Sequence, residues 1–408
     1  MHTCRIALSL SFVLLLGAAP APAQDVARVE PDASRPYVRL GRLLLHPTIA
    51  LTNLGVDSNV FNEPDGDGPR RDLTLTVTPQ TELWMRMGRS WVRGTIREDM
   101  VWYQTFTSER SANHQADAGW MLPLNRLTFD AHTAYLRTHD RPGVEVDARS
   151  QRRELLYDAS VELRARPKTF VGVRADSRTI DFDGAATFSQ VRLREALNRT
   201  VTSEAVTVRQ QLTPLTAVTL DVGRVQDRFA LSPLRDSNST AASLGVRFDR
   251  FALIKGRASV GYRDFQPVSS NLPAYRGTTA NADLSYAAFG TIRLAVQVYR
   301  DVQYSFDVNQ PYFLLTGLGG SLQRRVSRPF DLVARAGIQR LAYREPIDAA
   351  AAAAHRVDAI HTFGAGLGYH PGNEIRVGFD IDQQRRSSPL QARSYHGLRF
   401  GTSITYGF

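Results

Sequence analysis

Arginine is the residue in this chain whose type and spacing are best suited to chemistry. Arginines and carboxylates stand at every second position in segments such as Arg174, Asp176 and Arg178, so that these charged groups share one face of an extended chain. A guanidinium binds carboxylate or phosphate through two parallel hydrogen bonds. The chain has 50 Lys and Arg against 40 Asp and Glu, and only Lys168 and Lys255 are lysines. We expect ten arginines to line a common interior: Arg93, Arg97, Arg174, Arg178, Arg257, Arg263, Arg293, Arg335, Arg376 and Arg399.

Two interpretations of these interior arginines remain open. In the structural one, they pair with carboxylates on neighbouring strands and brace a wide fold. In the functional one, they form a basic constriction that attracts an anionic solute or an acidic polysaccharide. A basic excess also suits nucleic acid, but an exported protein rarely meets it, so we do not expect that partner.

Signals for enzymatic or cofactor chemistry are sparse. No histidine pair has metal-ligand spacing, and no glycine-rich phosphate loop follows a strand and opens a helix. We therefore expect no metal, no cofactor and no catalytic site, although spacing alone does not exclude a serine or carboxylate beside a histidine at the rim of the fold. Seven of the nine histidines are scattered beyond residue 100, at His114, His132, His139, His355, His361, His370 and His396.

Alternating extended segments must position these arginines. From about Leu43 onward, apolar residues alternate with polar ones at period two, without a sustained helical period. In the segment 292–299, for example, Ile292 and Leu294 alternate with Arg293 and Ala295. The alternation places Glu98 and Asp130 on faces that are otherwise apolar. This indicates that the assignment of residues to inward and outward faces is wrong by one residue in some segments.

The breaks between these segments fall into two kinds that alternate along the chain. Short breaks lie at 87–90, 122–126, 166–169, 212–215, 250–255, 287–291, 325–330 and 370–374. Longer polar breaks lie at 62–71, 107–113, 138–150, 181–198, 231–239, 266–275, 305–311, 344–356 and 386–393, and the alanine run 349–354 in one of them is expected to form a short helix.

Alternating tight turns and long loops are typical of a bacterial transmembrane barrel. The pattern predicts an all-β fold, a transmembrane antiparallel β-barrel of about eighteen strands, with sixteen possible, short periplasmic turns and long extracellular loops. Closure is required because unpaired backbone groups cannot face lipid. A soluble β-sandwich is the alternative, but many segments here exceed ten residues, whereas strands usually have about five or six.

The amino terminus indicates export. Arg5 precedes an apolar stretch, and a run of small residues ends at Ala23, which predicts a signal peptide over residues 1–23 that also removes the only cysteine, Cys4. We expect residues 24–42 to form a periplasmic segment and residues 43–408 to form the barrel. Together these features predict the outer membrane of a Gram-negative bacterium.

The carboxyl-terminal segment alternates to the last residue. His396, Leu398 and Phe400 begin an outward face that ends in Tyr406 and Phe408. This segment resembles the carboxyl-terminal signal of outer-membrane barrels, which their assembly machinery reads. The resemblance implies that Tyr406 and Phe408 act as the barrel-assembly signal.

A short motif near the mature amino terminus consists of Gly55, Asp57, Asn59, Val60 and Phe61, after a His-Pro pair. It resembles the first strand of the porin-like outer-membrane β-barrel family associated with exopolysaccharide biosynthesis and export. The resemblance implies a conduit or accessory in polysaccharide export and supplies no catalytic residues. A strand that ends in a polar turn would also favour this composition.

Four functions follow as hypotheses. The first is a conduit or accessory in exopolysaccharide export, and the second is a general diffusion porin for small anionic solutes. The third is an outer-membrane enzyme acting on lipid or polysaccharide, and the fourth is a barrel that serves as an adhesion surface. The expected partners are outer-membrane lipid and lipopolysaccharide, the barrel-assembly machinery, acidic polysaccharide and periplasmic export proteins.

Overall fold

A computed structural model describes residues 37–249, 252–327, 329–345, 356–372 and 374–407. The predicted signal peptide, the terminal Phe408 and the alanine run 349–354 lie outside the described residues. Among the described residues, no helix has the length and apolar character needed to cross a membrane.

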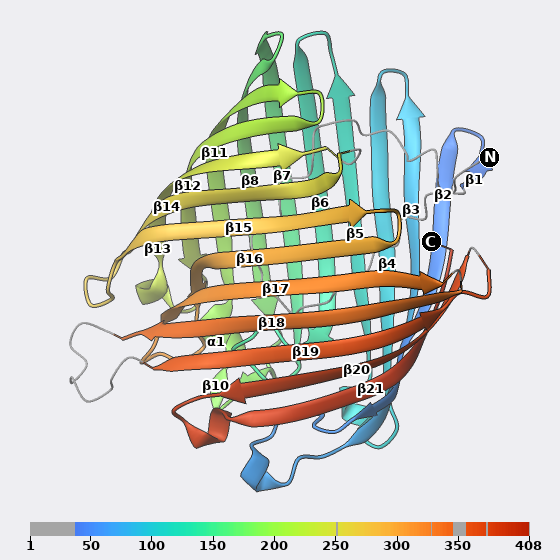
Figure 1. The fold of residues 1–408 in the computed structure, drawn as a ribbon. Coiled ribbons are helices and arrows are strands. Elements are labelled where there is room, and N and C mark those ends of the chain that lie inside the picture. Colours follow the sequence, from blue (N-terminus) through green and yellow to red (C-terminus); the bar gives the residue numbers. More distant parts are fainter. Residues whose placement is uncertain (1–36, 250–251, 328, 346–355, 373, 408) are drawn as a thin grey trace.

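Eighteen antiparallel strands form one closed wall (Figure 1). The ring closes where the first strand, β2, pairs with the last, β21, from Ile49 opposite Tyr406 to Asp57 opposite Arg399. This confirms the predicted all-β barrel. The wall strands are β2 (Leu43–Asp57), β3 (Asp72–Met87), β4 (Ser90–Tyr103), β5 (Ser111–Pro123), β6 (Leu127–Asp140), β7 (Ser150–Arg166), β8 (Thr169–Phe182), β11 (Arg199–Thr213), β12 (Thr216–Phe229), β13 (Ser237–Phe248), β14 (Ile254–Pro267), β15 (Tyr275–Ala288), β16 (Ile292–Tyr304), β17 (Tyr312–Ser327), β18 (Phe330–Arg344), β19 (Val357–Tyr369), β20 (Ile375–Ser387) and β21 (Tyr395–Tyr406).

Short turns and long loops alternate between these strands, as the sequence predicts. The long loops leave one end of the barrel, the extracellular end, at the lower left of Figure 1. The loop between β8 and β11 carries two short strands, β9 (Thr187–Phe188) and β10 (Val191–Arg192), and the helix α1 (Leu193–Leu197). At the opposite end, β1 (Val38–Leu40) pairs with Leu43–Leu45 of β2, beyond the point where β21 ends.

A β-bulge bends β2 within the motif segment. The pairing of β2 shifts between Leu51 and Leu54, and Asn53 at the bulge has a φ of 54°, a conformation that asparagine tolerates. The backbone of β21 then approaches so closely that a Cβ at Gly55 would overlap the carbonyl oxygen of Phe400. The close approach therefore requires glycine at position 55.

The outer face carries an uncharged band. On β7, its outward residues run from Leu155 to Leu163. They span about 26 Å along the strand. With a tilt of about 40°, that length gives about 20 Å across the bilayer, comparable to the apolar band of outer-membrane barrels. Among the described residues, most outward charges lie toward the extracellular ends of the strands. The exceptions are Arg324 beside a periplasmic turn and the opposed pair Glu204 and Arg224, which the register places level with Ala175 and Ala159.

The two residues that the sequence places on apolar faces have different explanations. Asp130 is buried and lies on the inward face of β6, opposite Ser160, so its assignment to the apolar face was wrong by one position. Glu98 does face outward, but it lies above the uncharged band and pairs with His114 at 2.8 Å.

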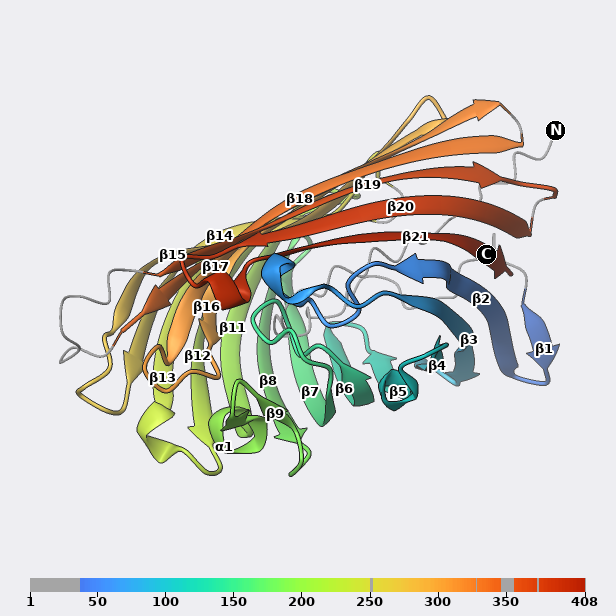
Figure 2. The ribbon, with the colours of Figure 1, turned by 90° about the horizontal axis from the view of Figure 1, so that it is seen from below.

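The barrel is flattened. Figure 2 shows β17–β21 along one side and β2–β8 with β11 and β12 along the other, curved side. Segments from the extracellular end occupy the space between these two sides, and they form the site described next.

Candidate functional site

The loop between β6 and β7, residues 141–149, crosses the extracellular mouth of the barrel. In the ring of strands, β6 and β7 lie nearly opposite β16–β19. Val144 of the loop nevertheless packs against a buried cluster on the inner face of those strands, which includes Phe313, Leu341 and Tyr343. The loop therefore spans the mouth from one wall to the other.

The segment that follows β2 holds one side of the β6–β7 loop. The Nη2 of Arg141 and the Nη1 of Arg149 donate hydrogen bonds to the carbonyl oxygen of Val60, at 2.8 and 2.9 Å. The side-chain amide of Asn62 donates to the Oδ1 of Asp147 at 3.1 Å. Because Val60 is fully buried, these bonds are shielded from water.

The motif residues shape this segment. Asp57 accepts a hydrogen bond from the backbone nitrogen of Asn59 and pairs with Arg399 at 2.6 Å. The side-chain amide of Asn59 donates to the carbonyl oxygen of Glu63, and the ring of Phe61 lies under Arg70. The motif thus forms an ordered turn that offers the Val60 carbonyl to the loop.

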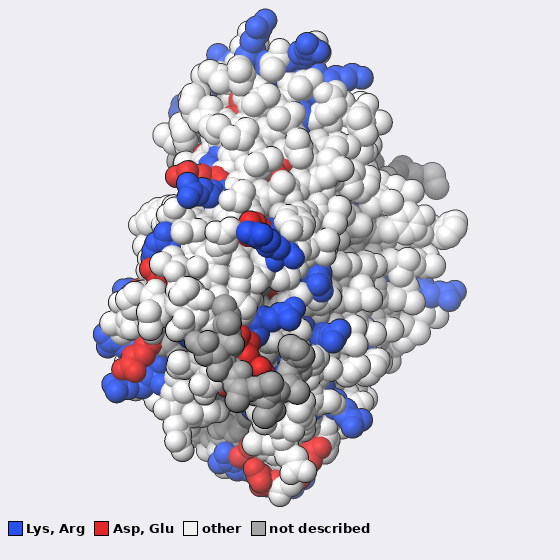
Figure 3. All heavy atoms as spheres, turned by 90° about the vertical axis from the view of Figure 1, so that its left-hand side faces the viewer, with Lys and Arg blue, Asp and Glu red and all other residues white. Residues whose placement is uncertain are grey.

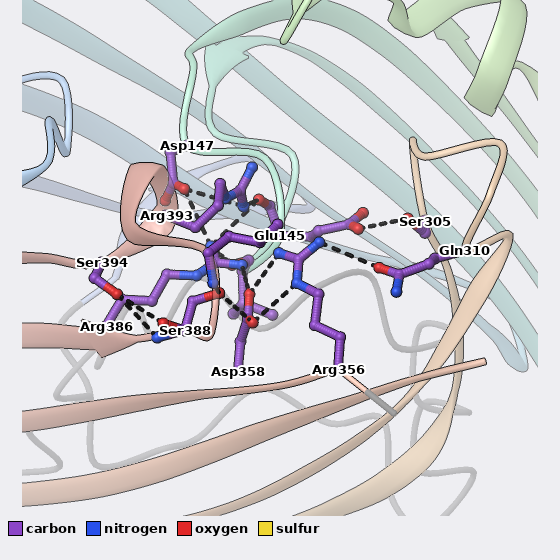
Figure 4. Close-up of polar contacts among 12 residues, drawn as sticks. Glu145, Asp147, Ser305, Gln310, Arg356, Asp358, Arg386, Ser388, Arg393 and Ser394 are labelled. Carbon is purple, nitrogen blue, oxygen red and sulfur yellow. Dashed lines mark hydrogen bonds and ion pairs between the residues drawn. The ribbon is translucent and has the colours of Figure 1, made fainter. Parts of the chain in front are cut away.

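A buried charge cluster holds the far side of the loop (Figure 4). Arg386, near the end of β20, is fully buried. Its Nη1 donates to the Val144 carbonyl at 3.0 Å and to Asp147 at 3.1 Å. Its Nη2 donates to Asp358 at 2.6 Å, and Arg356 binds the same Asp358 through two hydrogen bonds.

Arg393 adds a second guanidinium to this cluster. It lies in the loop between β20 and β21, pairs with Asp147 at 3.2 Å, and donates to the carbonyl oxygen of Glu145. Burial lowers the pKa of Arg393, and the nearby carboxylate of Asp147 opposes that shift. The backbone of the loop is thus held by two buried arginines from the opposite wall.

The tip of the β16–β17 hairpin enters the mouth from the wall. Pairing of β16 with β15 stops at Arg300 opposite Ala280, although both strands continue. Beyond that point, the Tyr304 ring packs 4.7 Å from that of Phe229, and its hydroxyl meets the Ser237 Oγ at 2.6 Å. Phe229 and Ser237 belong to β12 and β13, so the hairpin tip lies inside the wall that those strands form.

The hairpin tip and the β6–β7 loop meet at Glu145. The hydroxyl of Ser305 donates to its Oε1 at 2.5 Å, and the backbone nitrogen of Phe306 donates to its Oε2 at 3.0 Å. Burial raises the pKa of the Glu145 carboxyl, and these hydrogen bonds and the two arginines oppose the shift. Val146 and Phe306 share a buried cluster with Leu193 of α1. We call residues 141–149 and 305–311 together the mouth plug.

The structure places all ten predicted arginines on the inward face of the wall, below the mouth plug or beside it. Arg93, Arg257 and Arg293 lie within four residues of a periplasmic turn. The other seven form ion pairs with carboxylates: Arg97 with Asp99, Arg174 with Asp158, Arg178 with Glu154, Arg263 with Asp301, Arg335 with Asp380 and Asp382, Arg376 with Asp331, and Arg399 with Asp57.

Sequence reasoning missed the residues of the mouth plug. The segment 142–146, Pro-Gly-Val-Glu-Val, is the signal that could have indicated it, because two valines in a polar loop favour burial. Of the predicted assembly signal, Tyr406 lies on the outer face of β21 opposite Ile375 and is half exposed. Within the described part of the chain, no group of three or more His, Cys, Asp or Glu is placed to hold a metal ion.

Comparison with known proteins gives one family. The family model described as "Putative beta-barrel porin 2" matches residues 37–408. No curated protein sequence matches the chain.

Solved structures of outer-membrane proteins are similar in fold. The outer membrane channel DcaP of Acinetobacter baumannii is 15% identical, with a TM-score of 0.44, over 89% of this chain and 95% of that chain. A structure titled a bacterial polysaccharide outer membrane secretin is 11% identical, with a TM-score of 0.34, over 89% and 98%. A ferric enterobactin receptor is 11% identical, with a TM-score of 0.39, over 84% of this chain, which spans 63% of the receptor chain.

Proposed function

The chain belongs to the beta-barrel porin family whose model spans residues 37–408, and we propose that it is a gated conduit in exopolysaccharide export. The porin-like barrel lies in the outer membrane, in contact with its lipids. The gate in this proposal is the mouth plug, and the polymer approaches it from the periplasmic side.

The observation that carries the proposal is the contact between the two halves of the mouth plug at Glu145. A general diffusion porin needs a permanent water-filled path. Here Glu145, Arg386 and Val146 are each at most 5% exposed in the middle of the mouth. A path through this region therefore opens only when the β6–β7 loop or the hairpin tip moves, which suits a conduit that opens for its substrate.

The substrate class follows from the charge at the periplasmic end of the lumen. Inward arginines there outnumber carboxylates, so an acidic polymer is attracted into this end of the barrel. Many of the remaining inward arginines are already paired, which leaves a polar surface along which a chain of sugars can slide. The inward arginines near the periplasmic turns include Arg86, Arg93, Arg164, Arg209, Arg247, Arg257, Arg293, Arg325 and Arg376, and the inward carboxylates there include Glu82, Asp130, Glu162, Asp283 and Asp331.

Single-channel recording tests this proposal. The full-length barrel is inserted into a planar bilayer, and polygalacturonate or neutral dextran of matched length is added on either side. We expect a mostly closed channel whose brief openings are blocked by polygalacturonate from the periplasmic side and not by dextran. Steady conductance that is indifferent to both polymers would instead support a general diffusion porin for small anionic solutes. Cleavage of either polymer, or of the bilayer lipid, would indicate an outer-membrane enzyme.

A further inference from the structure

The outward charges of the barrel are distributed unevenly around its circumference. On β4–β15, several outward cations have acidic neighbours: His114 has Glu98 at 2.8 Å, and Arg153 has Asp181 at 3.3 Å. Arg276 likewise has Asp264 at 3.2 Å. In Figure 3, which faces the left-hand side of Figure 1, blue and red groups lie side by side at several places, with large uncharged areas between them.

The outer face of β18–β20 departs from this balance. Arg340, His361 and Arg385 stand at outward positions there, and we call them the cationic sector. Arg385 lies directly opposite His361 in the β19–β20 pairing. Arg340 is diagonal to His361, because its direct partner on β19 is Ala359. Among the described residues of β16–β20, no Asp or Glu occupies an outward position, so this sector carries cations without outward carboxylates.

The sector has the dimensions of a headgroup site. Opposed side chains on neighbouring strands lie about 5 Å apart and diagonal ones about 7–8 Å apart. Strands β18 and β20, which carry the two arginines, are separated by one strand and thus lie roughly 9–10 Å apart. Both guanidinium groups are exposed, so a single anionic headgroup can reach both.

The sector lies directly above the uncharged band. The next outward residues toward the membrane centre are Ile338 on β18 and Phe363 on β19, which are 42% and 55% exposed, and on β20 Gln383 is followed by Ile381, which is 43% exposed. A ligand bound here therefore meets cations at the level of the outer-leaflet headgroups and an apolar wall below. That arrangement fits a molecule with phosphates at one end and acyl chains at the other.

We propose that the cationic sector binds the phosphorylated headgroup of an anionic glycolipid of the outer leaflet. The two guanidinium groups hold its phosphates through charge-assisted hydrogen bonds, and its acyl chains lie along Ile338 and Phe363. A zwitterionic phospholipid fits less well, because its ammonium group would face the same cations. The site is on the outside of the barrel and is independent of any passage through the lumen.

Lipid binding to the full-length protein in detergent tests the site. The probes are bisphosphorylated lipid A, phosphatidylethanolamine and inorganic pyrophosphate, and bound lipid is measured by native mass spectrometry. The test variant is Arg340→Gln with Arg385→Gln. The matched control is Arg137→Gln with Arg153→Gln, which removes two exposed outward arginines at a similar height on β6 and β7. Heat-modifiable gel mobility shows that both variants are folded.

We expect the test variant to lose lipid A affinity by roughly tenfold for each arginine removed, whereas the control changes by less than about twofold. Wild-type affinity for phosphatidylethanolamine should be lower and insensitive to both variants. Equal loss in the test and control variants would overturn the proposal, because any outward arginine would then suffice. Pyrophosphate that binds as tightly as lipid A would identify a free phosphate site and would also overturn it.

Discussion

Replacement of Arg386 by glutamine tests the mouth plug most directly. The side chain joins the β6–β7 loop to the opposite wall through the Val144 carbonyl at 3.0 Å and Asp147 at 3.1 Å. Asp358 keeps two hydrogen bonds from Arg356 in the variant, so the end of β19 retains its charge pairing. The change therefore acts mainly on the loop rather than on the wall.

The size of the effect on channel opening follows from the hydrogen bonds that Arg386 makes to the β6–β7 loop only when that loop lies in the mouth. Each hydrogen bond to a charged group contributes about 1.5–3 kcal/mol, and three such bonds are lost, because the Nη1 of Arg386 also donates to the Glu145 carbonyl at 3.3 Å. We assign about 3 kcal/mol of the lost free energy to the closed channel, in which the loop lies in the mouth. This loss lowers the ratio of closed to open channel about 100-fold. Arg386→Lys keeps the positive charge but lacks the several donors of the guanidinium group, so its ratio of closed to open channel should lie between those of Arg386→Gln and wild type.

Open probability in planar bilayers measures this ratio. Arg335→Gln is the matched control, because Arg335 pairs with Asp380 and Asp382 on the inner wall and not with residues 141–149 of the loop. We expect frequent long openings for Arg386→Gln and wild-type behaviour for the control. If a correctly folded Arg386→Gln channel stays as closed as wild type, the arginine does not hold the mouth plug and the reasoning is refuted.

Three further predictions concern pH, assembly and the bulge in β2. Burial raises the pKa of Glu145 above its ordinary 4.5, so the loop binds a proton more tightly when it lies in the mouth than when it is free. Falling pH therefore favours the closed channel, and rising pH favours the open channel from about 4.5 upward. Glu145→Gln should flatten this dependence of conductance on pH. Deletion of Phe408 should impair insertion far more than removal of a loop charge such as Arg192→Gln, as measured by the heat-modifiable fraction in the envelope, and normal insertion of the truncated chain would contradict the terminal signal. Gly55→Ala should slow closure of the barrel and lower its unfolding temperature, because the new Cβ overlaps the Phe400 carbonyl, whereas Gly66→Ala, where a Cβ meets open space, should have little effect.

The sequence by itself determined the wall of this protein. Period-two alternation fixes which residues of a strand share a face, and the alternation of turns and loops fixes antiparallel order and strand number. These signals are local, so the ring of eighteen strands could be derived without coordinates. The motif from Gly55 to Phe61 was also visible, but its role in presenting the Val60 carbonyl to the loop was not.

Only the tertiary structure decided what occupies the mouth. Glu145, Ser305 and Arg386 are more than 80 residues apart along the chain, and no periodicity relates one long loop to another. Their contact depends on where the ring of strands brings each loop, and on the departure of the β16–β17 hairpin from the wall above Arg300. The same holds for the interior arginines: alternation aligned them on one face, but their carboxylate partners were set by the register and by side-chain reach, which in pairs such as Arg335 with Asp380 crosses an intervening strand.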